Sequence, residues 1–168
     1  MPINHGFLNG EEYRAIRKVL GFSQDDATEF HGLKNRRTIH QWESGRSTTS
    51  SCACIKMLDH IKTANDFVER KIWEQKHYRP QPIIFLTYDD NDENLYMQVA
   101  SDEFYFLSDY KMAIARAYVK CLEQGLDAHL VVFDPIKYDS FLEATNGVDT
   151  AKAREEWARQ YYMRFVKA

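Results

Sequence analysis

Start and stop signals for three short helices follow one another within residues 9–45, and no other feature of the chain constrains the fold as strongly. The first segment opens with the capping-box pair Asn9 and Glu12, and the second opens with Ser23 and Asp26 at the same spacing. Glycines, which often end helices, follow the three segments at Gly21, Gly32 and Gly45. The pattern predicts three consecutive short helices joined by tight turns.

The third segment, which Asn35 is expected to open, separates apolar from polar side chains. Ile39 and Trp42 lie three residues apart and predict a buried face. The other side carries hydrogen-bonding side chains, namely Arg36, Arg37, His40 and Gln41. Such a helix suits the major groove of DNA, about 12 Å wide, because arginine can bind guanine and glutamine can bind adenine through two hydrogen bonds. The second and third segments together therefore predict a helix-turn-helix.

Four further residues complete the expected DNA contacts. Gln24 lies in the first turn of the second segment, where backbone N–H groups and the helix dipole favour phosphate. Asn35 is expected to cap the third helix and to reach phosphate. Arg46 and Ser47 begin a hydroxyl-rich loop that is expected to donate to the next phosphates. The alternative for each of these residues is an ordinary role at the protein surface.

Three strings in this region resemble a known family: YRAIR at residues 13–17, FSQ at 22–24 and TIHQWESG at 38–45. They resemble the helix-turn-helix of the Cro and phage-repressor (XRE-like) class over about residues 9–62. The resemblance implies an internal ion pair between Arg17 and Glu43, and Arg14 is a second candidate partner for Glu43. The turn Gly32-Leu33-Lys34 is one residue longer than in that class, which leaves the register of Arg36 and Arg37 open.

A narrower resemblance joins both halves of the chain. YRAIRKVL and WESGRS, followed by a later strand and by FLSDYKMAIARAY, resemble the YdiL-like group, which includes anti-CRISPR-associated repressors. The resemblance implies a C-terminal dimerisation region and autoregulation of a neighbouring operon. This chain extends beyond those shorter relatives, and the extension fits either a ligand-sensing addition or a larger dimer interface.

The rest of the chain predicts an α+β protein that is mainly α. Apolar residues recur at helical spacing over residues 51–77, as one helix or as two with a break near residues 63–66. The prolines of residues 78–82 indicate a linker. We therefore expect a helix-turn-helix domain with its following helix or helices at 1–79, and an α/β dimerisation or sensing region at 80–168. Strands are expected at residues 83–88 and 128–133, and helices at 108–125, 136–144 and 150–166, which together form a small sheet of two or more strands with packed helices.

Charge divides along the same boundary. Residues 1–79 hold 13 lysines and arginines against 10 acidic residues, whereas residues 80–168 hold 9 against 15. The net charge of −3 argues weakly against nucleic acid, but a basic half is compatible with it. No apolar run is long enough to span a membrane and no signal peptide is expected, so we expect a cytoplasmic protein without a membrane partner. Three cysteines without a CxxC pair are expected to be free thiols, namely Cys52, Cys54 and Cys121.

Motifs for catalysis are missing from the sequence. It contains no GxSxG, GxxxxGK[ST], GxGxxG or HExxH pattern, and its histidines are scattered. We therefore expect no catalytic residue, no metal site and no cofactor. The leading expectation is a homodimeric repressor that binds an inverted repeat in double-stranded DNA through the major groove. The alternatives are an antitoxin-like module whose second half binds a partner protein, and a catalytic C-terminal region that DNA binding regulates.

Overall fold

The computed structural model describes residues 8–78, 82–92 and 103–166. Within them the protein is mainly helical, with seven α-helices and a two-stranded parallel sheet, which confirms the predicted α+β, mainly α class. The chain divides into two compact units, Met1–Asp66 and Phe67–Ala168. This division falls inside a helix, whereas the sequence placed it between residues 79 and 80. The predicted linker lies partly on residues 79–81, outside the described part of the chain.

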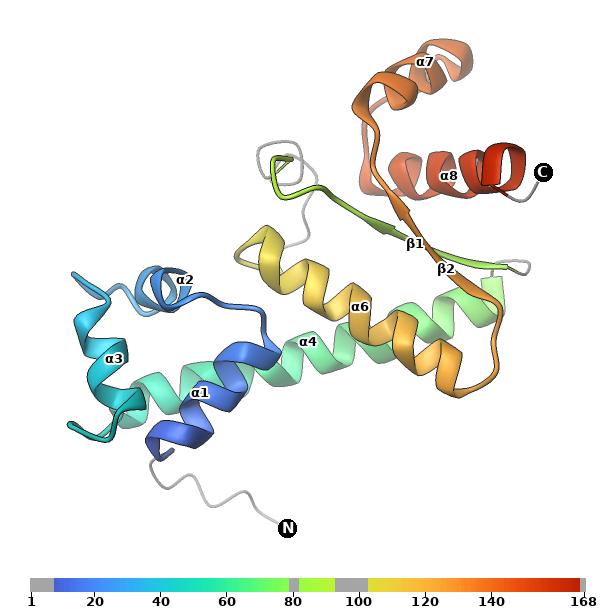
Figure 1. Ribbon diagram of the computed structural model, residues 1–168. Coiled ribbons are helices and arrows are strands. Elements are labelled where there is room, and N and C mark those ends of the chain that lie inside the picture. Colours follow the sequence, from blue (N-terminus) through green and yellow to red (C-terminus); the bar gives the residue numbers. More distant parts are fainter. Residues whose placement is uncertain (1–7, 79–81, 93–102, 167–168) are drawn as a thin grey trace. The chain divides into compact units, whose positions relative to one another are not determined.

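The first unit contains α1 (Gly10–Val19), α2 (Gln24–Phe30), α3 (Arg37–Glu43) and the beginning of α4 (Ser51–Tyr78), as Figure 1 shows. Both predicted N-caps are present, and each forms a capping box. The Asn9 side chain accepts the backbone N–H of Glu12 at 2.9 Å, and the Ser23 hydroxyl accepts that of Asp26 at 3.0 Å. The glycines that end these helices have positive φ angles of 79° at Gly21, 66° at Gly32 and 70° at Gly45. Local signals in the sequence therefore define α1 and α2 and the turns that end them.

Aromatic side chains join these short helices into one core. Tyr13 and Ile39 are fully buried, and the Tyr13 ring meets the edge of Trp42 with centroids 5.5 Å apart, which packs α1 against α3. Phe22, which follows α1, stacks on His60 of α4 at 5.6 Å. The core consists of a few large, closely packed rings, so the shapes of these rings determine the angle between α1 and α3.

The fourth helix is continuous, so the break considered near residues 63–66 is not there. Its buried face in the first unit is also different from the expected one. The predicted apolar stripe began at Ile55 and included Ala64; Ala64 is buried as expected, but Ile55 is 48% exposed, and Met57 and His60 face the core in its place. Because the polar residue His60 lies at the centre of this face, the apolar periodicity of the sequence does not reveal it.

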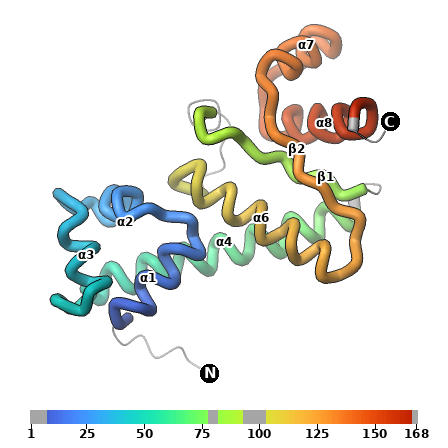
Figure 2. Tube along the Cα trace, in the orientation of Figure 1, coloured from blue at the N-terminus to red at the C-terminus, as the bar shows by residue number. Residues whose placement is uncertain are grey.

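The second unit contains the end of α4, β1 (Ile83–Thr87), α6 (Leu107–Glu123), β2 (Ala128–Val132), α7 (Pro135–Thr145), α8 (Ala151–Tyr161) and a π-helical turn, η1 (Tyr162–Val166). Figure 2 follows the chain from β1 through α6 to β2. The two strands pair in parallel with Ile83 opposite Ala128, as a crossover connection requires. Both predicted strands are thus confirmed, and α6, the helix predicted at residues 108–125, connects them.

Packing of the second unit is uneven between its two strands. Four consecutive residues of β1 are buried, as is usual for a parallel strand covered on both faces. Leu86 and Val131 share a hydrophobic cluster with Trp157 of α8. In contrast, β2 leaves Leu130 42% exposed and Val132 56% exposed. The sheet therefore has one covered strand and one strand with apolar side chains at the surface.

None of the described helices is long and apolar enough to cross a membrane. In the same described residues, no three histidine, cysteine, aspartate or glutamate side chains gather closely enough to hold a metal ion. The three cysteines are free thiols, and of these only Cys52 is exposed.

Candidate nucleic-acid interface

The third helix has one buried and one exposed side. Ile39 is fully buried and Trp42 is 7% exposed, so both belong to the core as predicted. Arg37 and His40 lie on the exposed side, and Gln41 is half-buried beside them. Residues three and four apart share a helical face, so these three side chains are neighbours on the surface of α3. They present guanidinium, imidazole and amide groups together.

The start of α3 differs from the prediction. The helix begins at Arg37 rather than at Asn35, and Arg36 occupies the position before it. The Asn35 side chain accepts the backbone N–H of Arg37 at 3.1 Å. This local turn satisfies one of the free N–H groups at the helix start, so Asn35 caps the helix from two residues away. Arg36 consequently lies in the turn, and Arg37 is the first arginine on the helix itself.

The loop after α3 is held to the end of the helix. The backbone carbonyl of Gln41 accepts N–H groups from Arg46 at 3.0 Å and from Ser47 at 3.2 Å. Both side chains are exposed. These bonds keep the predicted phosphate-binding residues next to the last turn of α3, because the loop cannot move away without breaking them.

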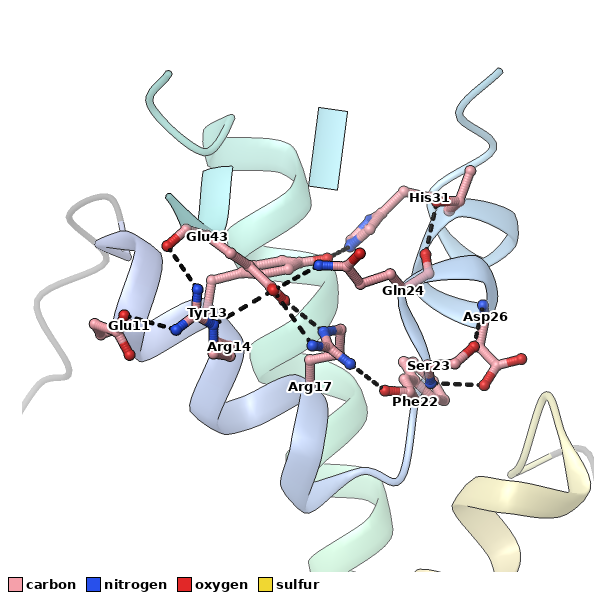
Figure 3. A network of polar contacts seen from close by, with 11 residues as sticks. Glu11, Tyr13, Arg14, Arg17, Phe22, Ser23, Gln24, Asp26, His31 and Glu43 are labelled. Atoms are coloured by element: carbon pink, nitrogen blue, oxygen red, sulfur yellow. Dashed lines mark hydrogen bonds and ion pairs between the residues drawn. The ribbon is translucent and has the colours of Figure 1, made fainter. Parts of the chain in front are cut away.

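A buried carboxylate fixes α3 to the two preceding helices. Arg17 Nε lies 2.5 Å from Glu43 Oε1, and Gln24 Nε2 donates to Glu43 Oε2 at 2.9 Å. Arg14 Nε reaches the same oxygen at 3.4 Å, and Arg17 also donates to the Phe22 carbonyl at 2.6 Å. Figure 3 shows the three side chains converging on Glu43. We call Arg14, Arg17, Gln24 and Glu43 the Glu43 clamp.

Electrostatics make this clamp a structural element. Only 2% of the Glu43 side chain and 9% of the Arg17 side chain are exposed. Burial acts to raise the pKa of Glu43, but hydrogen bonds from Arg17 and Gln24 outweigh it and hold the pKa below its ordinary value. Glu43 is therefore ionised at neutral pH, and the ion pair predicted between Arg17 and Glu43 is present. The carboxylate is directed into the protein and not towards the exposed side of α3.

The Glu43 clamp changes the role of Gln24. Sequence reasoning placed Gln24 at a phosphate, but in the structure its amide N–H group donates to Glu43 and the residue is half-buried. Phosphate binding by Gln24 stays a prediction, and its supporting role in the motif is a contact that the sequence reasoning missed.

The arginines near the exposed side of α3 differ in whether an acidic side chain lies close to them. Arg36 Nη1 lies 3.9 Å from Asp25 Oδ2, and both side chains are well exposed, so this pair is weak. Among the described residues no acidic side chain pairs with Arg37 or Arg46. Those two guanidinium groups are therefore free to meet an anion.

A second polar contact joins the end of α2 to α1. His31 Nε2 lies 2.9 Å from the Tyr13 hydroxyl, inside a group of rings that includes Trp42. Burial, assisted by the charge of Lys56, lowers the pKa of His31 to about 4. This histidine is neutral at physiological pH and supports the packing behind α3.

Comparison with known proteins yields no match, either among protein-family models or among curated proteins.

Proposed function

We propose that this protein is a sequence-specific DNA-binding regulator of the helix-turn-helix type, acting as a homodimeric repressor. One observation carries the proposal: the Glu43 clamp and the buried Trp42 hold α3 against α1 and α2, while Arg37 and His40 remain exposed on its outer side. A reading helix needs this combination of a rigid back and free polar side chains.

The proposed contacts divide into two groups. Arg37, His40 and Gln41 would meet base edges, because they share the exposed face of α3. The flanking residues would bind phosphate and fix the position of the helix in the groove, and these are Gln24, Asn35, Arg36, Arg46 and Ser47. Arg36 lies in the turn before α3 and Arg37 is the first arginine on the helix itself, so Arg37 is the first candidate for specificity.

Homodimerisation follows from the length of α3, which has seven residues and spans too few base pairs for useful specificity. Two copies on an inverted repeat would place their α3 helices about 34 Å apart. The second unit offers a surface for this contact. β2 exposes Leu130 and Val132 and contains neither the lysine nor the proline that commonly protects a strand at a sheet edge.

The test begins with selection of bound sequences from random duplexes, using the full chain, with the mass of the protein measured in parallel. The proposal expects a palindromic site and the mass of a dimer. Recovery of no preferred sequence at low salt would contradict sequence-specific binding. A palindrome bound by a monomer would contradict the dimer alone.

Arg37→Ala then tests the assigned reading face. We expect a loss of about 1–3 kcal/mol in binding the selected duplex and a relaxed preference at one base position. Lys152→Ala is the matched control, because this exposed lysine of α8 carries the same charge far along the chain. Equal losses on selected and scrambled duplexes would reduce Arg37 to a phosphate contact, and no loss would remove it from the interface.

A further inference from the structure

A groove in the second unit lies between α7 and α8, with a volume of about 560 Å³. This volume falls within the range of small-molecule sites, roughly 300–1,000 Å³. Four aromatic side chains and two cationic ones are among its lining residues, namely Phe141, Trp157, Tyr161, Phe165, Lys137 and Arg164. The combination of ring faces and positive charge narrows the chemistry that the groove can accept.

The aromatic residues form an ordered row. Trp157, Tyr161 and Phe165 follow one another at steps of four along α8 and η1. The rings of Trp157 and Tyr161 stack at 5.4 Å and 24°, and those of Tyr161 and Phe165 lie 5.3 Å apart at 39°. Phe165 remains 69% exposed. A continuous ring surface that ends in an exposed phenylalanine is suited to stacking against another planar group.

The π-helical turn is a second, independent observation. Short π-helical turns occur frequently at functional sites, because they shift side chains away from their normal α-helical positions. Here η1 begins directly after α8 and carries both Arg164 and Phe165 into the lining of the groove. The irregular backbone thus supplies one aromatic and one cationic group to the same place.

Of the two cationic side chains in the groove, only Arg164 is available to bind an anion. Lys137 lies over the Tyr161 ring at 4.9 Å, but its ammonium already pairs with Asp134 at 2.9 Å. Arg164 is exposed, and no acidic side chain pairs with it in the described part of the chain. A guanidinium can bind a carboxylate, sulfonate or phosphate through two parallel hydrogen bonds.

Neutral polar groups in the lining are largely occupied. The hydroxyls of Ser140 and Thr145 donate to carbonyls of their own helix, at 3.2 Å and 2.9 Å. Because these hydroxyl groups are already engaged, Arg164 is the strongest hydrogen-bond donor that the groove offers to a ligand. We propose that the groove between α7 and α8 binds a small aromatic anion, whose ring stacks on Tyr161 and Phe165 and whose charged group binds Arg164.

Two fluorescent probes of nearly the same shape test this assignment on the full chain. One is 1-anilinonaphthalene-8-sulfonate, and the other is N-phenyl-1-naphthylamine, which lacks the sulfonate. We expect saturable binding of one sulfonate probe per chain and weaker binding of the neutral probe. Arg164→Gln should weaken the sulfonate probe about tenfold, the value of one charge-assisted hydrogen bond, and leave the neutral probe unchanged.

Phe165→Ala should weaken both probes, because it removes part of the stacking surface. Lys152→Gln is the control for charge, since it removes one positive charge of α8 outside the groove, and it should change neither affinity. Equal affinities of the wild-type protein and Arg164→Gln for the sulfonate probe would overturn the proposal. A dimer that Phe165→Asp dissociates would also overturn it, because the groove would then be an interface between copies. No DNA enters this experiment, so its result is independent of the proposed function.

Discussion

Each unit of the protein buries one arginine against one carboxylate, but the two pairs are built differently. Arg17 and Glu43 lie 26 positions apart, and both side chains are almost completely buried. Arg154 and Asp149 lie five positions apart; the Arg154 side chain is 1% exposed, whereas that of Asp149 is 34% exposed. The first pair joins two helices, and the second joins α8 to the residue just before its cap.

The surroundings of the two pairs explain what each one does. Glu43 is bonded by side chains from α1 and α2, so its carboxylate determines where α3 lies. Arg154 receives support from several directions: two bonds to Asp149, at 2.7 and 2.8 Å, and the face of Phe133 at 4.6 Å. Tyr138 also donates to Asp149 at 2.9 Å. In the first unit a single carboxylate therefore holds the helices together. In the second unit a carboxylate and several aromatic rings together stabilise the buried arginine.

Glu43→Ala should produce the largest effect. It leaves Arg17 buried without its anion, and loss of one partner of a buried pair costs about 3–5 kcal/mol. Hydrogen exchange followed by mass spectrometry should show lost protection in α1 to α3, with α7 and α8 unchanged. Glu11→Ala is the matched control, because the 77% exposed Glu11 side chain pairs with Arg14 at the surface and should contribute less than about 1 kcal/mol. Normal protection of α3 in Glu43→Ala would show that the clamp is dispensable.

As the pH falls, the first unit should lose stability before the second. His31 has a pKa of about 4 in the folded protein and about 6.5 when unfolded, so the unfolded chain binds more protons between these values. The first unit is therefore expected to keep its full stability above pH 6.5 and to lose about 3 kcal/mol as the pH falls to 4. Asp149, whose pKa its bonds to Arg154 lower, loses its contribution only below the ordinary aspartate range.

Urea unfolding at a series of pH values measures this difference, with hydrogen exchange used to separate the units. The Tyr13 hydroxyl and the Lys56 ammonium are the polar and charged groups that act on His31. His31→Gln should flatten the profile of the first unit between pH 6.5 and about 5.5, above the range in which Glu43, whose pKa is also shifted, begins to contribute. A slope that persists in the variant would assign the effect to another group.

Asp149→Asn should have a smaller effect than Glu43→Ala. The amide keeps the shape and part of the hydrogen bonding, and water already reaches residue 149, so we expect a loss of about 1–3 kcal/mol. Asp139→Asn, at an exposed position of α7, is the control and should lie within about 0.5 kcal/mol of the wild type. A loss in the second unit as large as that caused by Glu43→Ala would remove the distinction between the two pairs.

Sequence reasoning succeeded where structure is determined locally. The caps at Asn9 and Ser23 and the buried back of α3 follow from neighbours within a few residues. Among contacts between distant or buried polar residues, only the pair of Arg17 and Glu43 was expected, and that expectation came from the resemblance. The inner face of α4 includes His60, and the support of Arg154 comes from strands and helices that no periodic pattern relates. The exposed face of α3 could be predicted, but the bond that turns Gln24 towards Glu43 could not.

The helix caps provide the finest comparison between the units. Asn9 belongs to a capping box, in which the Glu12 carboxylate accepts the backbone N–H of Asn9 at 2.8 Å. The Thr150 hydroxyl accepts the N–H of Ala153 at 3.1 Å, but the alanine side chain has no acceptor with which to return the bond. Each substitution by alanine should cost about 0.5–2 kcal/mol, with Asn9→Ala the larger because it also releases Glu12. Chemical denaturation of both variants measures the difference, and a larger loss for Thr150→Ala would mean that the start of α8 is held by its cap more than by Arg154.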